Sequence, residues 1–251
     1  MDDIQIQEEK NVDISDSMLI VAFPTVGLVS TIAGQYIIDS FKLEKIGVIS
    51  SRYFMPAAVI HNSVPSPPVR IYSGKKTCAG DACSQLVVII SEFMPPADLV
   101  QPLVDKIIDW AETKHCKIVL TLEGMHASGE KTSRTFGVAT TEKMKVLLKE
   151  YGIDEIKEGM IAGDSGVLLY RGSQLQRDII CLIAEAHAAY PDSRAAGKLL
   201  EALDKLLPGM KIDPEPLYKQ ANEIEQRIRS FISASKPTAP QTSPIPSSMY
   251  E

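Results

Sequence analysis

Residues 18–27 read Met18-Leu19-Ile20-Val21-Ala22-Phe23-Pro24-Thr25-Val26-Gly27. The apolar residues that open this stretch predict a β-strand with both faces buried, which is typical of a parallel sheet covered by helices. The proline and the glycine that follow predict a turn. Apolar side chains then recur at helical spacing over residues 28–40 and predict a helix. A buried strand, a turn and a helix in this order indicate an α/β fold.

The same alternation continues along the chain. Short apolar runs predict further strands, and longer stretches with an apolar stripe predict helices. Thr140 or Thr141 and Asp192 are the expected N-caps of two of these helices. We therefore expect one α/β domain over residues 15–213, with a mostly parallel or mixed sheet, after a polar lead-in at residues 1–14. The further strands are expected at residues 45–50, 55–61, 69–73, 85–91, 118–122 and 179–185, and the further helices at residues 97–114, 140–151 and 192–207.

The composition argues against two classes of partner. The chain carries 26 Lys and Arg against 32 Asp and Glu, a formal net charge of −6, so broad binding to nucleic acid is not expected. Its longest apolar runs, at residues 18–23 and 86–90, fall short of the roughly 20 residues that a membrane-spanning helix needs. The acidic N-terminus lacks the layout of a signal peptide, and the cysteines lie in apolar segments, as reduced thiols do. We expect a cytoplasmic protein.

Three short motifs are too weak to indicate catalysis or a cofactor. Gly163-Asp164-Ser165-Gly166 resembles the nucleophile segment of trypsin-like proteases, but those proteins are all-β, so we interpret the motif as a tight turn. Gly74-Lys75-Lys76-Thr77 lacks the upstream glycine and the residue order of a phosphate-binding loop. Cys78 and Cys83 lack the companions that a zinc site needs. We therefore expect no cofactor and no metal.

Glu123 and His126 follow a predicted strand, at the edge where α/β folds usually bind their ligands. A carboxylate and an imidazole in such a pocket can perform acid–base chemistry. The alternative is a pair of surface polar groups at a strand end, and it is favoured because no nucleophile or cofactor-binding loop accompanies the two residues. A nucleoside-phosphorylase-like enzyme that uses this strand-end pocket is therefore the second hypothesis for function.

Residues 214–232 predict a last helix with a seam of apolar residues. Its apolar positions alternate in steps of four and three, as they do in a coiled coil. The seam packs either on its own domain or against a neighbouring subunit, and its short length does not decide between the two. The seam positions are Leu217, Ala221, Ile224, Ile228 and Phe231.

Residues 233–251 form a tail of a different composition. Ser, Pro, Thr and Ala dominate residues 233–248, which predicts a disordered segment. The last three residues, Met249, Tyr250 and Glu251, combine an apolar side chain, a phenol and a terminal carboxylate. These groups suit a docking peptide whose ring becomes buried and whose carboxylate pairs with a lysine or with backbone amides. A chance tyrosine near a frayed end is the alternative.

Taken in order, several motifs of the chain resemble those of the archaeal branch of the proteasome assembly chaperone family. The resemblance covers about residues 15–232 and departs from the family pattern at Thr25, where a glycine often follows the proline. The residues that carry it are Phe23-Pro24-Thr25-Val26-Gly27-Leu28-Val29, Glu123-Gly124-Met125, Gly163-Asp164-Ser165-Gly166-Val167-Leu168-Leu169, Ala184-Glu185-Ala186-His187, Tyr190-Pro191-Asp192 and Ala195-Ala196.

This resemblance implies a three-layer, nucleoside-phosphorylase-like domain that has lost its enzymatic residues and forms homo-oligomers. Some members of the family carry a C-terminal motif of a hydrophobic residue, a tyrosine and any residue, which inserts between α subunits of the proteasome core particle. Met249, Tyr250 and Glu251 match this motif. We therefore expect an ATP-independent, non-enzymatic chaperone or adaptor that assists the assembly or activation of the core particle. A homo-oligomeric scaffold for another protein is a third hypothesis.

Overall fold

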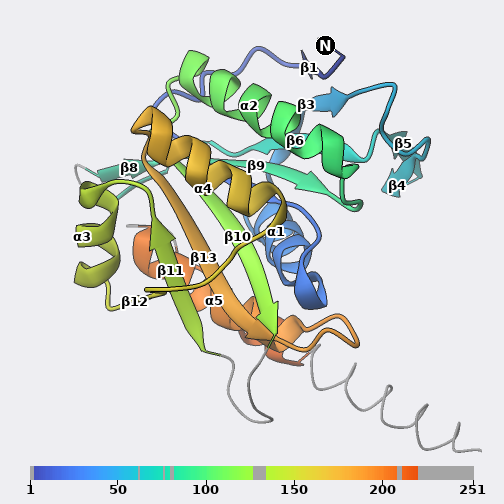
Figure 1. The fold of residues 1–251 in the computed structure, drawn as a ribbon. Coiled ribbons are helices and arrows are strands. Elements are labelled where there is room, and N and C mark those ends of the chain that lie inside the picture. Colours follow the sequence, from blue (N-terminus) through green and yellow to red (C-terminus); the bar gives the residue numbers. More distant parts are fainter. Residues whose placement is uncertain are drawn as a thin grey trace, which may run out of the picture.

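The computed structural model describes residues 3–61, 63–75, 77–79, 82–126, 134–207 and 211–219. Within this part of the chain a nine-stranded sheet runs through the centre, in the order β1-β3-β6-β9-β2-β10-β13-β11-β12 (Figure 1). Its strands are β1 (Gln5–Glu8), β2 (Met18–Ala22), β3 (Glu44–Ser50), β6 (Val69–Ser73), β9 (Leu86–Ser91), β10 (Ile118–His126), β11 (Thr135–Ala139), β12 (Asp154–Glu155) and β13 (Ile179–Ala186).

The centre of the sheet is parallel and its sides are largely antiparallel. Strand β2 pairs in parallel with β9 on one side and with β10 on the other, and β10 pairs in parallel with β13. Beyond β9, the strands β6, β3 and β1 follow in antiparallel order, and β11 is antiparallel to β13. The sheet is therefore mixed, and its parallel part coincides with the strands that alternate with helices.

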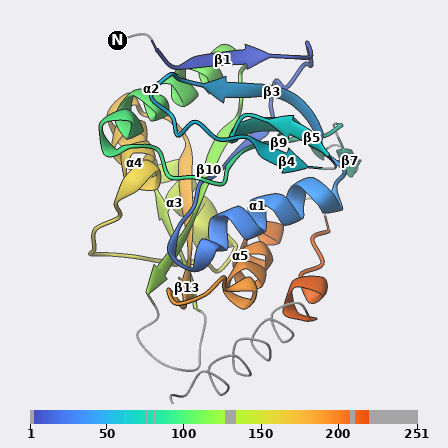
Figure 2. The ribbon, with the colours of Figure 1, turned by 90° about the vertical axis from the view of Figure 1, so that its right-hand side faces the viewer.

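Helices cover both faces of the sheet, which gives the three layers that the family resemblance implies. Helices α2 and α4 lie on one face, and α1 and α5 lie on the other (Figures 1 and 2). A single turn of 3₁₀ helix, Val26–Leu28, leads into α1. The helices are α1 (Val29–Ser40), α2 (Ala97–Thr113), α3 (Glu142–Glu150), α4 (Gly163–Leu175) and α5 (Ser193–Leu206).

Each face of the central strand packs into a different core. Ile20 and Ala22 of β2 pack into the core shared with α1 and α5, whereas Leu19 and Val21 pack into the core shared with α2. All four side chains are 0% exposed. Because successive side chains of a strand point to opposite faces, a strand covered on both sides has to be apolar at every position.

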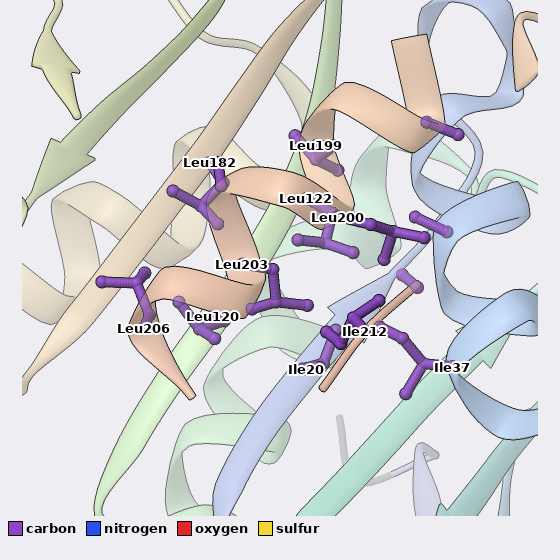
Figure 3. Packing of buried hydrophobic residues seen from close by; sticks show 14 of the residues in the cluster. Ile20, Ile37, Leu120, Leu122, Leu182, Leu199, Leu200, Leu203, Leu206 and Ile212 are labelled. Carbon is purple, nitrogen blue, oxygen red and sulfur yellow. The ribbon is translucent and has the colours of Figure 1, made fainter. Parts of the chain in front are cut away.

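Helix α5 supplies a large part of the core on its face of the sheet. Its leucines lie over Leu120 of β10 and Leu182 of β13 (Figure 3). Helix α1 approaches the same face closely at Gly34, where an added Cβ atom would lie 2.6 Å from the Cβ of Ala22. A side chain at this position would therefore push α1 away from the sheet. The α5 leucines labelled in Figure 3 are Leu199, Leu200, Leu203 and Leu206.

Three strands of the sheet, β1, β11 and β12, were not predicted, and one predicted strand lies outside it. Strand β1 falls within the polar lead-in, and β11 precedes the helix predicted from Thr140; both are short and partly exposed. Of the strand predicted at residues 55–61, only β4 (Val59–His61) forms, and it pairs with β5 (Val64–Ser66) in a separate hairpin. A second hairpin consists of β7 (Thr77–Ala79) and β8 (Ala82–Ser84).

The predicted helix caps are confirmed, whereas one predicted turn is wrong. Thr141 accepts a hydrogen bond from the backbone N–H of Met144 (3.3 Å), and Asp192 accepts one from the backbone N–H of Ala195 (2.9 Å). The segment Gly163–Gly166, interpreted as a tight turn, instead forms the first turn of α4. Glycine, aspartate and serine favour turns locally, but an acidic residue is also favourable at the positive end of a helix.

The predicted last helix is described only at its start. Residues 215–219 are helical, and Leu217 is 3% exposed within the core that α1 and α5 share. The first position of the predicted seam therefore packs on its own domain, while the other four positions lie outside the described residues. No helix in the described part of the chain is long and apolar enough to span a membrane.

We expect Leu203→Ala to lower the free energy of unfolding by about 2–5 kcal/mol, because Leu203 is 0% exposed and its loss would leave a cavity between α5 and the sheet. Urea denaturation measures this change. Leu175→Ala is the matched control, because Leu175 is 44% exposed and its replacement should change stability by less than about 0.5 kcal/mol. Equal effects of the two substitutions would contradict the described packing of α5.

Candidate functional site at the carboxyl ends of the parallel strands

The carboxyl ends of β2, β10 and β13 lie side by side and meet the first turn of α4. Four segments that are distant in sequence come together here, at residues 24–28, 121–126, 163–165 and 185–192. They include residues from each of the longer motifs that carry the family resemblance. Open α/β sheets usually bind their ligands at this edge.

The loop after β2 is held by close packing on its neighbours. Gly27 has a positive φ of 63°, and its carbonyl oxygen accepts a hydrogen bond from the backbone N–H of Asp192 (2.8 Å). Gly124 lies directly beneath the loop, because an added Cβ atom would be 2.2 Å from the carbonyl oxygen of Val26. The Asp192 carboxylate also accepts a hydrogen bond from the backbone N–H of His187 (3.0 Å). The loop, the end of β10 and the start of α5 therefore form one packed unit.

The threonine that departs from the family pattern fits this loop without strain. Thr25 has an extended backbone, with φ −132° and ψ −175°, which any residue can adopt. Its hydroxyl oxygen accepts a hydrogen bond from the backbone N–H of Ser30 (3.4 Å) in the first turn of α1. The conformation of the turn therefore depends on Gly27 and not on a glycine at position 25.

Beneath α4, polar side chains of β10 and of the first turn of α4 form a hydrogen-bonded cluster. The hydroxyls of Thr121 and Ser165 are 2.7 Å apart, and Ser165 is hydrogen-bonded to Glu123. Glu123 also accepts a hydrogen bond from the backbone N–H of Gly124 (3.1 Å). If Ser165 donates to the Glu123 carboxylate, Thr121 is the donor to Ser165. Asp164 is 3% exposed and lies close enough to affect Glu123 electrostatically.

Both carboxyl groups of this cluster have raised pKa values. Burial raises the pKa of Glu123 from 4.5 to about 7; the hydrogen bond from Ser165 opposes this shift, and the negative charge of Asp164 adds to it. Burial likewise raises the pKa of Asp164 from 3.8 to about 6. The pKa of the Cys181 thiol is raised chiefly by burial and further by Glu123 and Asp164. Two carboxyl groups with raised pKa values, about 7 for Glu123 and about 6 for Asp164, therefore lie next to an inert thiol.

A further buried carboxylate at this edge is paired with an arginine. Glu185 of β13 is 2% exposed, and Nη2 of Arg134 lies 2.8 Å from its Oε1 atom. The backbone N–H of Arg134 donates a further hydrogen bond to Glu185 Oε2 (3.2 Å). The ion pair therefore ties the start of β11 to the end of β13, and the hydrogen bond that Arg134 donates to the Glu185 carboxylate raises the pKa of Arg134.

The structure does not bring the predicted pair Glu123 and His126 together. Both lie in β10, which extends beyond the predicted strand to His126. Residues three apart in a strand point to opposite faces of the sheet, so Glu123 lies under α4 whereas His126 points to the other side and is exposed. The acid–base pair proposed for an enzyme is therefore not formed.

Sequence reasoning missed Thr121, Asp164 and Glu185 as members of this edge. A signal was present, because Thr121 and Glu123 occupy alternate positions of an otherwise apolar strand. The position of α4, which covers Thr121 and Glu123, could not be predicted from the sequence. Ser165 is 0% exposed, so a substrate cannot reach its hydroxyl. The cluster can hold a proton, but it does not offer an accessible nucleophile.

Other predicted site residues fall outside this edge or outside the described residues. Met249, Tyr250 and Glu251 lie outside the described residues, as do Ala221, Ile224, Ile228 and Phe231 of the predicted seam. Within the described ranges, no group of three or more His, Cys, Asp or Glu side chains is placed to hold a metal ion. Strands β7 and β8 place Cys78 opposite Cys83.

Comparison with known proteins relates the whole α/β body to other chains. The profile of the PAC2 family matches residues 19–232. An uncharacterized protein of Methanocaldococcus jannaschii is 28% identical over 231 residues, which is 92% of each chain. The crystal structure of Pyrococcus furiosus PbaA, described as an archaeal homolog of proteasome-assembly chaperone, is 26% identical with a TM-score of 0.81, and the match covers 92% of both chains.

A second protein of Pyrococcus furiosus has the same fold. The crystal structure of PbaB, described as an archaeal proteasome activator, has a TM-score of 0.81 and covers 92% of this chain and 100% of its own. Its sequence identity is 24%, so this likeness extends to the architecture alone.

The raised pKa of Glu123 predicts a pH dependence of stability. Because the folded-state pKa lies above the ordinary 4.5, the folded protein holds more protons than the unfolded chain between about pH 4.5 and 7. Stability is then greatest below this window and falls as the pH rises through about 7. We expect Glu123→Gln to raise the free energy of unfolding at pH 8 by roughly 1–3 kcal/mol, with little effect at pH 4.5. Glu158→Gln, at an exposed position, is the control in urea denaturation.

The close contact at Gly124 predicts a steric effect. Gly124→Ala should destabilise the protein by about 1–3 kcal/mol, because the new Cβ atom would meet the backbone oxygen of Val26 at 2.2 Å and displace the loop after β2. Gly159→Ala is the control, since its nearest neighbour would be 3.6 Å away. Thermal unfolding compares the two variants, and an unchanged melting temperature for Gly124→Ala would contradict the described loop packing.

Proposed function

The chain belongs to the PAC2 family, and on this basis we propose that it is a chaperone or adaptor that binds the proteasome core particle. The observation that carries the proposal is the similarity to PbaA over 92% of both chains, with 26% identity and a TM-score of 0.81. Similarity of this extent covers the whole α/β body and not one motif. A role in assembly or activation of the core particle follows from the same comparison.

In this proposal the α/β body carries a binding peptide and does not itself perform chemistry. The strand-end edge supports a non-enzymatic role, because Glu123 and His126 lie on opposite faces of the sheet and Ser165 is 0% exposed. The four residues Gly74-Lys75-Lys76-Thr77 lack the order of a phosphate-binding loop, which supports an action that does not require ATP.

The proposed binding peptide is Met249-Tyr250-Glu251. Residues 233–248 lie between it and the body, and their Ser, Pro, Thr and Ala content is that of a flexible linker. Sixteen residues span at most about 50 Å when extended. The methionine and the tyrosine ring would be buried in a pocket between α subunits, and a free carboxylate on Glu251 would pair with a lysine there.

Several copies of this peptide on one assembly would strengthen the binding. Three residues make few contacts, so one tail should bind weakly. A homo-oligomer would present several tails to a ring of α subunits, and after the first tail binds, the linker keeps the others at a high effective concentration. The proposal therefore includes self-association of the chain in the cytoplasm.

The proposed docking is tested by surface plasmon resonance on immobilised core particles. We expect full-length chain to bind without ATP, whereas Tyr250→Ala and a chain that ends at Ser248 should lose at least about 30-fold in affinity, because a buried tyrosine at an interface contributes about 2 kcal/mol or more. Ser247→Ala is the matched control in the same tail and should bind like the full-length protein.

The outcomes separate the parts of the proposal. Unchanged binding by the chain that ends at Ser248 would contradict docking by the tail, and the contact would then lie on the α/β body. Unchanged binding after a glycine is added behind Glu251 would contradict the role of the free carboxylate. Absence of binding by the full-length chain would contradict the proteasome as the partner.

A further inference from the structure

One hairpin of the chain stands apart from the central sheet. Strands β4 and β5 pair antiparallel with each other, with Val59 opposite Ser66, Ile60 opposite Pro65 and His61 opposite Val64. Among the described strand pairings they pair with no other strand. The hairpin projects from the right-hand side of the molecule in Figure 1 and faces the viewer in Figure 2.

Both faces of this hairpin expose large apolar side chains. Ile60 is 63% exposed and Val64 is 59% exposed. Residues opposite each other in a hairpin point to the same face, and adjacent pairs point to opposite faces. Ile60 is paired with Pro65, and Val64 belongs to the adjacent pair, so the Ile60 and Val64 side chains point to opposite faces. In the segment that leads into the hairpin, Tyr53 and Met55 are each 53% exposed. A two-stranded hairpin without a covered apolar face is only marginally stable in water.

The hairpin and its flanks carry no charged side chain. Residues 53–69 contain no Lys, Arg, Asp or Glu, although charged residues make up 23% of the chain. An exposed projection of a soluble protein normally carries charges, whereas the cores of protein interfaces are depleted of them. Copies of this chain repel each other in general because the net charge is −6. In a contact around a two-fold axis, each residue near the axis faces the same residue of the other copy. Because residues 53–69 carry no charge, such a contact places no like charges next to each other.

The backbone distinguishes the two outer edges of the hairpin. In an antiparallel ladder, opposite pairs alternate between those that exchange hydrogen bonds and those whose N–H and C=O groups point outward. Because Pro65 has no N–H, Ile60 and Pro65 cannot exchange two backbone hydrogen bonds with each other. They therefore form a pair whose backbone groups point away from the partner strand. The outer edge of β4 therefore offers the N–H and C=O groups of Ile60, whereas Pro65 offers no donor on the edge of β5.

The position of the strands agrees with this difference. Ser66 of β5 accepts a hydrogen bond from Nζ of Lys45 in β3 (3.3 Å), which ties β5 to the body of the domain. Prolines on an edge strand hinder the addition of another strand, and β5 is flanked by further prolines at Pro67 and Pro68. Strand β4, which contains no proline, is the edge at which pairing can continue.

We propose that β4 pairs antiparallel with β4 of a second copy of the chain around a two-fold axis at Ile60. The N–H and C=O groups of Ile60 then exchange two hydrogen bonds with those of Ile60 in the copy, and a four-stranded sheet with β5 at both outer edges results. The apolar side chains on the two faces of the hairpins become part of this contact. The inference rests on the self-association included in the proposed function and gives it a location.

The first experiment places a charged residue at the two-fold axis and needs only the purified chain. Light scattering of the full-length protein should give a mass that is an even multiple of 27.5 kDa. Ile60→Lys and Ile60→Asp should each reduce this mass at least twofold, because like charges face each other across the axis. An equimolar mixture of the two variants should restore it, since lysine then faces aspartate.

Val146→Lys is the matched control, because Val146 is 54% exposed on α3, at the opposite side of the sheet from the hairpin. The assembly formed by this variant should have the same mass as that of the unmodified protein. Circular dichroism should be the same for all variants, since Ile60 does not contribute to the core. An unchanged mass for Ile60→Lys, or a mixture that does not restore the assembly, would overturn the proposal. Neither result bears on the tail, because no core particle is present.

The second experiment measures proximity at the axis. In a hydrogen-bonded antiparallel pair the two Cα atoms lie about 5.5 Å apart, which is within the range of a disulfide. Ile60→Cys should therefore form a covalent dimer under mild oxidation. Val64→Cys should not, because β5 and its copy would lie three strand spacings, roughly 14 Å, apart. Equal cross-linking of both variants, or of neither, would overturn the pairing at Ile60.

Discussion

The structure depends on complete burial of strand β2. Its backbone is paired on both sides, with β9 and with β10, and its side chains enter two separate cores. A strand in this position has no exposed edge and no exposed face, so a helical layer is needed on each side of the sheet. The pairs α1 with α5 and α2 with α4 meet this need. The three-layer architecture is therefore a consequence of where this one strand lies.

Burial also explains the chemistry at the carboxyl ends of the parallel strands. Helix α4 covers polar side chains of β10, and the resulting loss of solvent raises the pKa values of Glu123 and Asp164. On the other face of β10, the loop after β2 packs so closely that only glycine fits at position 124. An edge that serves as a ligand site in many α/β proteins is thus filled here by hydroxyls, protonatable carboxyls and a packed loop. This arrangement agrees with the proposal that the body presents a binding peptide.

The margins of the sheet are protected in different ways. Strand β1 closes one side with mostly exposed polar residues, and β12 closes the other side with two acidic residues. Hairpin β4–β5 lacks such protection on the edge of β4, and it is free of charge over residues 53–69. A protein with net charge −6 that keeps one neutral, apolar projection has a surface suited to contact with its own copy.

The sequence by itself determined the buried central strands, the helices that alternate with them and the caps at Thr141 and Asp192, because these features are set by apolar periodicity and by local hydrogen bonds. It also supplied the family resemblance and the motif at Met249, Tyr250 and Glu251. Only the tertiary structure decided which strands were added at the sides, because β1 and β11 are short and depend on distant partners. It likewise decided that Glu123 and His126 separate, since the strand continues past the predicted end and alternation sends their side chains to opposite faces.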